Sequence, residues 1–211
     1  MSDRNSNKYA PAALEARQKY IADEPQRVQP LREEEFDGDA RALVTEVRKA
    51  LGVDETTSIP PVFGAMLKAP GLFRCQVQMG IELLGKGAIS PRERELVILR
   101  VGWRCRAPYV WGEHVDVAKR YGVTPEEVER VTQGSGAPGW SGHDRAIIKA
   151  VEELLEDQMI ANETWSTLSQ RWTERQLIEL PILVGQYFTI IMQQNSLRIQ
   201  LASNNIGLKE R

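Results

Sequence analysis

Histidine and cysteine are scarce in this sequence, with two of each among 211 residues. The two cysteines, Cys75 and Cys105, lie thirty positions apart and do not form the framework of a disulfide-rich domain. So few histidines and cysteines also leave few ligands for a zinc or iron site, and we expect no bound metal.

The sequence also lacks a long apolar segment and an excess of charge of one sign. No apolar run reaches about 18 residues, so we expect no transmembrane helix. The first twenty residues are polar and lack the apolar segment of a signal peptide. Lys and Arg number 27 against 29 Asp and Glu, which gives no electrostatic reason to expect nucleic acid or a membrane as partner. These features favour a soluble, cytoplasmic protein in a reducing compartment.

Apolar residues make up 42% of the chain, which is enough to bury a core. They recur with the helical period, and no window alternates with a period of two residues, so we expect an all-α fold. Residues 1–35 are charged and contain three prolines, which predicts an N-terminal arm, and residues 36–205 predict a single helical domain. The expected helices span residues 12–20, 39–51, 62–69, 72–84, 91–104, 109–121, 125–131, 142–157, 162–170 and 174–201.

The scarce reactive residues gather in one stretch, residues 90–121. Glu95 falls inside a predicted helix among apolar neighbours, where a carboxylate is costly unless it is paired. His114 lies on the next helix, three residues after Trp111, so both project from one face of that helix. We expect the two helices to pack face to face and to bring Glu95 and His114 together. Such a pair can hold one imidazole nitrogen and leave the other to move a proton, or it can be a purely structural hydrogen bond.

Other residues near this stretch favour structural roles. Cys105 is expected to be a small buried hydrophobe rather than a nucleophile. His143 follows a serine and a glycine at a helix start, which favours a surface or capping position. Three arginines are expected to be solvated, although one of them could bind a substrate carboxylate: Arg100, Arg104 and Arg106.

The segment ELVILRVGWRCRAPYVWGEHVDVAKRYGVTPEEV resembles the carboxymuconolactone decarboxylase family, within the alkylhydroperoxidase D-like superfamily. The resemblance rests on a glutamate in E-L-x-I-L-R-V and on Tyr-x-Trp-x-x-His followed by Gly-Val-Thr. The matching positions are Glu95, Tyr109, Trp111, His114 and residues 122–124. The later segment VGQYFTIIMQQNS, with Tyr187 and Asn195, resembles the closing helix of the family, so the resemblance spans about residues 60–200.

One departure from the superfamily pattern concerns the thiol peroxidases. That branch has Cys-x-x-Cys seven and four residues before the histidine, and these positions are Ala107 and Val110 here. Cys105 lies two residues too early and has no partner in the motif. Because such a peroxidase needs a reacting and a resolving sulfur, we expect that activity to be absent.

The resemblance implies an all-helical homo-oligomer, a dimer, trimer or hexamer, with pockets near the subunit contacts. It also implies a cofactor-independent lyase acting on a small organic acid, lactone or phenolic compound, as in the catabolism of aromatic compounds. The reaction would be decarboxylation, a retro-aldol-type cleavage or proton transfer next to a carbonyl.

In this hypothesis His114 is the general acid and base, and Glu95 orients it. Tyr109 or Tyr187 donates to a developing oxyanion, and Trp111 forms an apolar wall. Arg104 is the candidate for binding a substrate carboxylate. The alternative is a non-catalytic binding or assembly protein of the same fold, and the two differ in whether the pair faces a cavity or a sealed core.

Overall fold

A computed structural model describes residues 7–51, 53–56 and 59–211, and in these ranges every regular element is helical. The all-α prediction is therefore confirmed. Five short 3-10 or π segments accompany the α-helices: residues 7–9, 19–23, 33–35, 81–85 and 207–209. The α-helices are α2 (Pro11–Gln18), α3 (Gly38–Leu51), α4 (Pro61–Met66), α5 (Pro70–Gly80), α6 (Pro91–Arg104), α7 (Pro108–Arg120), α8 (Pro125–Gln133), α9 (Gly142–Asp157), α10 (Asn162–Ser169) and α11 (Glu174–Leu197).

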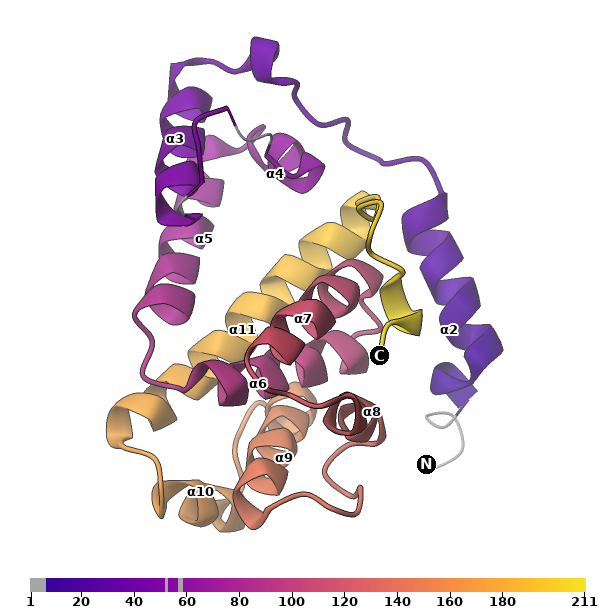
Figure 1. The fold of residues 1–211 in the computed structure, drawn as a ribbon, viewed down its shortest axis with the longest axis vertical. Coiled ribbons are helices and arrows are strands. Elements are labelled where there is room, and N and C mark those ends of the chain that lie inside the picture. Colours follow the sequence, from indigo (N-terminus) through magenta and orange to yellow (C-terminus); the bar gives the residue numbers. More distant parts are fainter. Residues whose placement is uncertain (1–6, 52, 57–58) are drawn as a thin grey trace.

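Helix α6 lies at the centre of the molecule, with α7, α9 and α11 packed around it (Figure 1). Every residue from Arg94 to Trp103 is buried, including two arginines and Glu95. One apolar cluster joins α6 to α9 and α11, and a second joins it to α7 and α8. A helix that is enclosed on all sides has no polar face, so its charged side chains must find partners inside the protein.

Side-chain caps begin several helices as the sequence predicts. Thr124 and Glu127 form a capping box at α8, and Thr173 and Gln176 form another at α11. At α6 such a box is only half formed. The Ser90 hydroxyl accepts from the backbone of Glu93, but the Glu93 carboxylate accepts from that hydroxyl and from His143 rather than from the Ser90 backbone.

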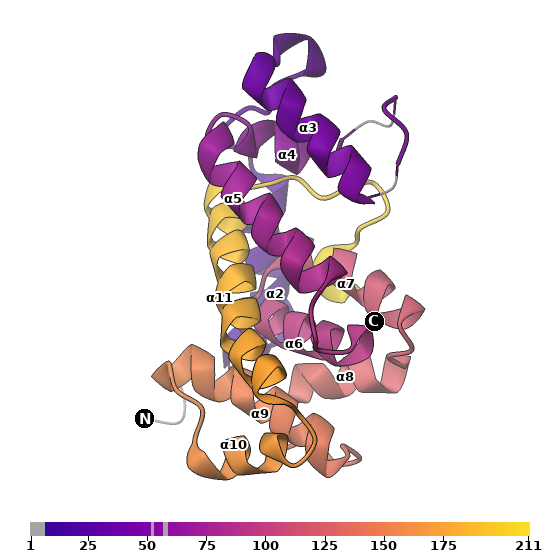
Figure 2. The ribbon, with the colours of Figure 1, turned by 90° about the vertical axis from the view of Figure 1, so that its left-hand side faces the viewer.

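The N-terminal segment packs against its own chain. Tyr9 and Leu14 contact the second apolar cluster, and residues 24–32 then cross the top of the molecule to reach α3 (Figure 1). The backbone of this crossing is anchored by bonds from Arg27 N to Leu197 O and from Leu31 N to Gly64 O, both 3.0 Å long. It leads to a third apolar cluster between α3 and α5, which stand together at one end of the molecule in Figure 2.

The C-terminal segment returns to cover α7. Leu208 enters the second apolar cluster, and the Trp111 indole donates to Glu210 O at 3.0 Å. Asn205 donates to Tyr109 O at 3.0 Å and to Glu113 Oε1 at 2.8 Å, so it holds two turns of α7. The tail thus fixes the helix that carries His114. Within the described ranges, no helix has both the length and the hydropathy that a membrane span requires.

We predict that Gly112→Ala will lower the free energy of unfolding by about 1–3 kcal/mol, because its methyl group would overlap the Asn205 carboxamide. That carboxamide cannot move without losing its bonds to α7. Gly102→Ala is the matched control, since its methyl group would meet Val110 Cγ1 at an ordinary 3.6 Å. Chemical denaturation measures both, and equal stability of the two variants would contradict the prediction.

Candidate functional site

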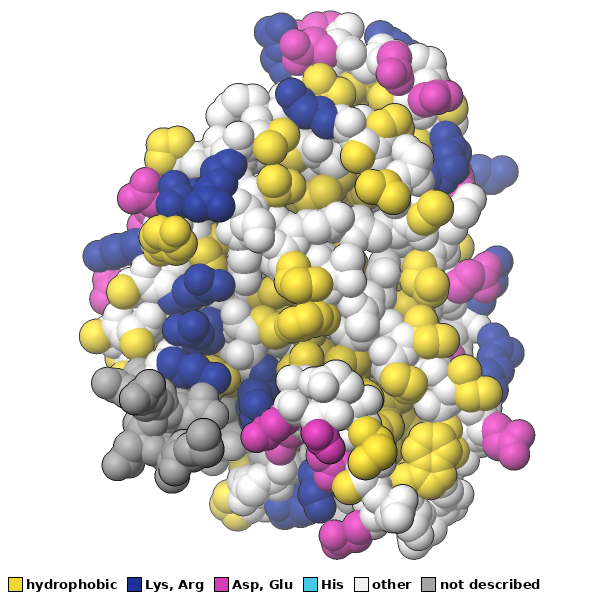
Figure 3. All heavy atoms as spheres, turned by 180° about the vertical axis from the view of Figure 1, so that it is seen from behind, with side chains coloured by type: hydrophobic (Ala, Val, Ile, Leu, Met, Phe, Trp, Pro, Cys, Tyr) yellow, Lys and Arg dark blue, Asp and Glu magenta, His cyan; other side chains and the backbone are white. Residues whose placement is uncertain are grey.

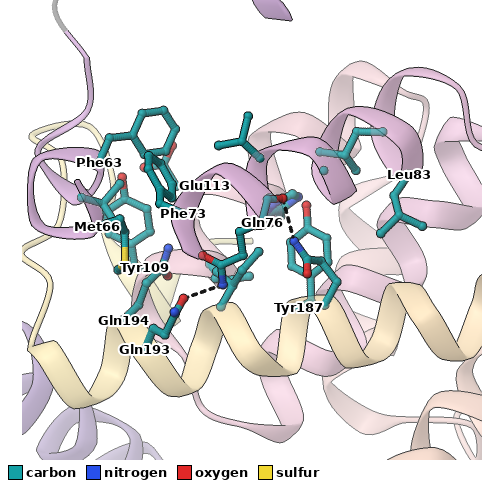
Figure 4. Close-up of a pocket in the computed structure, with 18 residues that line it drawn as sticks. Phe63, Met66, Phe73, Gln76, Leu83, Tyr109, Glu113, Tyr187, Gln193 and Gln194 are labelled. Atoms are coloured by element: carbon teal, nitrogen blue, oxygen red, sulfur yellow. Dashed lines mark hydrogen bonds between the residues drawn. The ribbon is translucent and has the colours of Figure 1, made fainter. Parts of the chain in front are cut away.

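A cavity of about 290 Å³ lies between α4, α5, α7 and α11. Phe63, Met66 and Phe73 gather at one end, and Leu83 and Tyr187 lie toward the other (Figure 4). This volume is close to the lower end of ligand pockets, which hold roughly 300–1,000 Å³. The polar side chains that line the cavity are Gln76, Tyr109, Glu113, His114, Gln186, Tyr187, Gln193 and Gln194.

His114 on α7 and Glu95 on α6 meet at one side of this cavity. His114 Nδ1 lies 2.7 Å from Glu95 Oε2, as the packing predicted from the sequence requires. The Glu95 side chain is 1% exposed, whereas His114 is 17% exposed and lines the cavity. The pair therefore extends from the interior of the protein to a surface that a ligand can reach.

The carboxylate of Glu95 fixes the state of the imidazole ring. A carboxylate oxygen accepts a hydrogen bond, so we assign the proton of neutral His114 to Nδ1. Nε2 is then the nitrogen that can accept a proton from a ligand. The second carboxylate oxygen of Glu95 lies 3.4 Å from Arg94 Nε, and Arg94 also donates to Leu84 O at 2.9 Å. Both oxygens of this buried carboxylate thus have partners.

Two tyrosines place phenol groups in the cavity. The rings of His114 and Tyr187 pack edge to face, with their centroids 5.0 Å apart. Burial, assisted by the charge of Glu95, raises the pKa of Tyr187. Burial and the neighbouring Glu113 raise the pKa of Tyr109 to about 12. Both phenols therefore keep their protons at neutral pH and can donate hydrogen bonds.

Sequence reasoning missed the amide groups of the cavity. Gln76 on α5 donates to Gln193 on α11 at 2.6 Å, and Gln186 donates to Gln76 O at 3.1 Å (Figure 4). Gln194 is 9% exposed, and its Oε1 is buried without a hydrogen-bond partner. The signal was present as two adjacent glutamines directly after the apolar residues Ile-Ile-Met in TIIMQQNS.

Two residues assigned to substrate binding from the sequence do not line this cavity. Trp111 is fully buried between α6 and the C-terminal tail, so it does not form a wall of this cavity. Arg104 lies 3.9 Å from Glu156 at the far end of α6 and is not placed to bind a carboxylate in the cavity. Helical spacing gives the face of a residue on its own helix but not the element that lies opposite, so the sequence could not place these two side chains relative to the cavity.

His143 and Arg100 are also placed differently from the sequence interpretation. His143 is buried rather than exposed, with Nε2 3.0 Å from Glu93 Oε1 and its ring against Trp172. Arg100 is not solvated, since it is 5% exposed and pairs with Glu152 at 2.6 Å. The protein thus has a second His–Glu pair, but His143 lines none of the four cavities found among the described residues.

Cys105 is partly buried at the C-terminal end of α6 and packs against the first apolar cluster. Burial raises the pKa of its thiol to about 11, although nearby arginines oppose the shift. At neutral pH the reactive thiolate is therefore a minor species. Among the described residues, no three His, Cys, Asp or Glu side chains gather in a group that could hold a metal ion.

The model of one protein family, the carboxymuconolactone decarboxylase family, matches residues 70–153, from the start of α5 into α9. These residues form a carboxymuconolactone decarboxylase domain. The domain contains Glu95, Tyr109 and His114, but α4 and α11, which supply much of the cavity lining, lie outside the matched range. Among curated proteins, none matches the sequence at a significant level.

Two solved structures share the fold of this chain. One is the alkylhydroperoxidase AhpD core of an uncharacterized peroxidase-related protein from Ralstonia eutropha JMP134, with a TM-score of 0.71 and 15% identity. It covers 87% of this chain and 99% of its own. The other is a protein of unknown function from Agrobacterium tumefaciens described as an antioxidant defence protein AhpD. Its TM-score is 0.58 at 16% identity, over 65% of this chain and 95% of its own. At these identities the likeness shows an AhpD-like fold alone.

We predict that iodoacetamide will alkylate exposed Cys75 at least about 100-fold faster than Cys105 in the folded protein near pH 8. A thiol pKa of about 11 leaves roughly one thiolate in a thousand at that pH, and the reaction should accelerate as the pH rises toward 11. Mass spectrometry of the wild type and of Cys75→Ser measures the two sites separately. Similar rates at both cysteines in the native protein would contradict the prediction.

Proposed function

We propose that the protein is a cofactor-independent lyase that acts on a small organic acid, lactone or phenolic compound. The observation that supports the proposal most directly is that His114 lines a cavity while its Nδ1 is held by buried Glu95. A histidine that is oriented on one nitrogen and reachable on the other has the arrangement of a general base.

The proposed reaction begins with proton transfer next to a carbonyl group. His114 Nε2 takes a proton from the carbon beside the carbonyl, and the electron pair of the broken C–H bond moves into the carbonyl to form an enolate. The imidazolium that results faces the Glu95 carboxylate, which stabilises its charge. Return of the proton to another carbon completes an isomerisation. In a retro-aldol-type cleavage, His114 instead takes the hydroxyl proton and a C–C bond breaks to give the same enolate.

The cavity supplies a donor for the developing oxyanion. The Tyr187 phenol belongs to a ring in contact with His114, and the Tyr109 phenol lies on the same helix as that histidine. Both remain protonated at neutral pH because burial raises their pKa values. Donors in an apolar cavity stabilise a developing negative charge more than they do in water.

A thiol peroxidase is disfavoured, although both similar structures carry peroxidase or antioxidant descriptions. The positions that would need the two cysteines are the buried residues Ala107 and Val110. The thiol nearest to these positions in the sequence, Cys105, has a raised pKa, and neither Cys105 nor Cys75 lines the cavity.

We predict that His114→Gln will lower turnover by about 10²–10⁴-fold, because glutamine can keep a bond to Glu95 but cannot accept the proton. The assay follows substrate loss and deuterium uptake from heavy water in a panel of lactones, phenolic ketones and hydroxy ketones, by mass spectrometry. His143→Gln is the matched control, since it also alters a His–Glu bond but lies away from the cavity.

The expected result is loss of activity in His114→Gln and retention in His143→Gln, with both variants folded. Unchanged turnover in folded His114→Gln removes this histidine from the mechanism. If the wild type binds compounds from the panel but converts none of them, the protein is a binding protein of this fold rather than an enzyme.

We further propose that copies of the chain associate through the exposed face of α11. Four large apolar side chains recur on this helix with exposed fractions of 40–63%: Ile178, Ile182, Phe188 and Met192. Figure 3 shows hydrophobic side chains gathered in the middle of the face seen from behind, with many charged side chains toward its edges. Exposed apolar patches of this kind commonly mark protein–protein contacts.

The double variant Ile182→Asp/Phe188→Asp is expected to run as a monomer of 23.8 kDa, because charged side chains cannot be buried in an apolar contact. Size-exclusion chromatography with light scattering measures the mass, and the wild type should be a dimer, trimer or hexamer. The control is the double variant Ser166→Asp/Gln170→Asp, which changes two exposed residues, one on α10 and one directly after it. This variant should keep the oligomeric mass of the wild type. A monomeric wild type would refute the association.

A further inference from the structure

The charges around the cavity suggest which ligands it accepts. Among the described residues that line it, none is a lysine or an arginine. Its ionisable groups other than phenols are Glu113, an acid, and His114, which is paired with the acid Glu95. A protonated His114 and the neighbouring Arg94 would carry two positive charges, which Glu95 and Glu113 balance, so these groups together supply no surplus positive charge to a ligand.

Two arginines of α6, Arg94 and Arg104, lie outside the cavity lining and each contacts a glutamate. Arg94 contacts Glu95, donates to Leu84 O and lies over the Tyr121 ring at 5.5 Å. Arg104 faces Glu156 outside the cavity. A carboxylate entering the cavity would lose its hydration and find Glu113 rather than a cation, which is costly in an apolar environment.

The amides of the cavity are suited to an uncharged polar ligand. Gln76 on α5 donates to the Gln193 amide on α11, and Gln186 on α11 donates to the backbone oxygen of Gln76. Gln194 also lines the cavity, and its Oε1 is buried without a hydrogen-bond partner. A buried acceptor of this kind gains most from a ligand that donates a hydroxyl or N–H group. Phe63 and Phe73 offer ring faces at one end of the same space (Figure 4).

We propose that the substrate is a small neutral ring compound that carries a carbonyl and a hydroxyl or N–H donor, and that carboxylates are excluded. This inference rests on the proposed function, in which His114 acts beside a carbonyl. It narrows that function, because loss of CO₂ requires a carboxylate substrate. The reactions that remain for this protein are retro-aldol-type cleavage and proton transfer next to a carbonyl. The family takes its name from a carboxylated lactone, which is an anion at neutral pH. The substrate of this chain would instead be neutral.

Two nearly isosteric probes test the inference directly: para-hydroxybenzamide, which is neutral, and para-hydroxybenzoate, which is an anion at neutral pH. Isothermal titration calorimetry of the wild-type protein measures both. We expect the amide to bind at least about tenfold more tightly, since only the carboxylate must be desolvated as a charge. Equal binding, tighter binding of the benzoate, or binding of neither probe would overturn the inference.

Two pairs of variants locate the binding and its cause. Gly80→Leu fills space at a residue that lines the cavity and should abolish amide binding, whereas Gly71→Leu on the same helix lies outside the lining and should preserve it. Gln193→Arg adds a cation at the cavity and should raise benzoate affinity about tenfold. Gln170→Arg, at an exposed position, should leave the preference unchanged. Amide binding that survives Gly80→Leu would overturn the assignment of the ligand to this cavity.

The failure of this inference can be distinguished from failure of the proposed function. A preference for the benzoate together with loss of turnover in His114→Gln rejects the neutral substrate and keeps the histidine mechanism. A preference for the amide together with unchanged turnover in His114→Gln rejects the mechanism and keeps the ligand class.

Discussion

The burial of the Glu95 carboxylate inside α6 is the constraint on which the arrangement of the site depends. A charged side chain that is 1% exposed is tolerated only when its oxygens have partners, and here these are His114 and Arg94. The bond to His114 joins α6 to α7 and orients the imidazole ring. The same bond leaves Nε2 unengaged by Glu95, so a requirement of folding also orients the ring for the general-base role that we propose.

The second His–Glu pair shows that this bond alone does not define a functional site. His143 and Glu93 lie 3.0 Å apart, but His143 packs edge to face with Trp172 in the protein interior. His114 differs because α5 and α11 leave a space in front of it. The chemistry of a histidine depends on what can approach its free nitrogen as much as on what holds the other.

The cavity is assembled from segments that lie far apart in the sequence. The decarboxylase-family domain at residues 70–153 supplies Glu95, His114 and Tyr109, whereas α11 supplies Tyr187 and the glutamines. The groups that would do the chemistry therefore lie mainly within residues 70–153, and many of the groups that would select the ligand lie outside this range. This division gives a physical reason why a family match does not identify the substrate.

The sequence by itself determined the helices and the pairing at the centre of the site. Apolar periodicity and caps such as Thr124 and Thr173 specify helices locally, and a buried carboxylate requires a partner that only a few residues could provide. Only the tertiary structure decided the cavity. Trp111 and His114 share a helix, yet the C-terminal tail covers the indole while α11 faces the imidazole. Periodicity fixes the direction of a side chain relative to its own helix, but which helix or tail lies opposite depends on packing between distant segments.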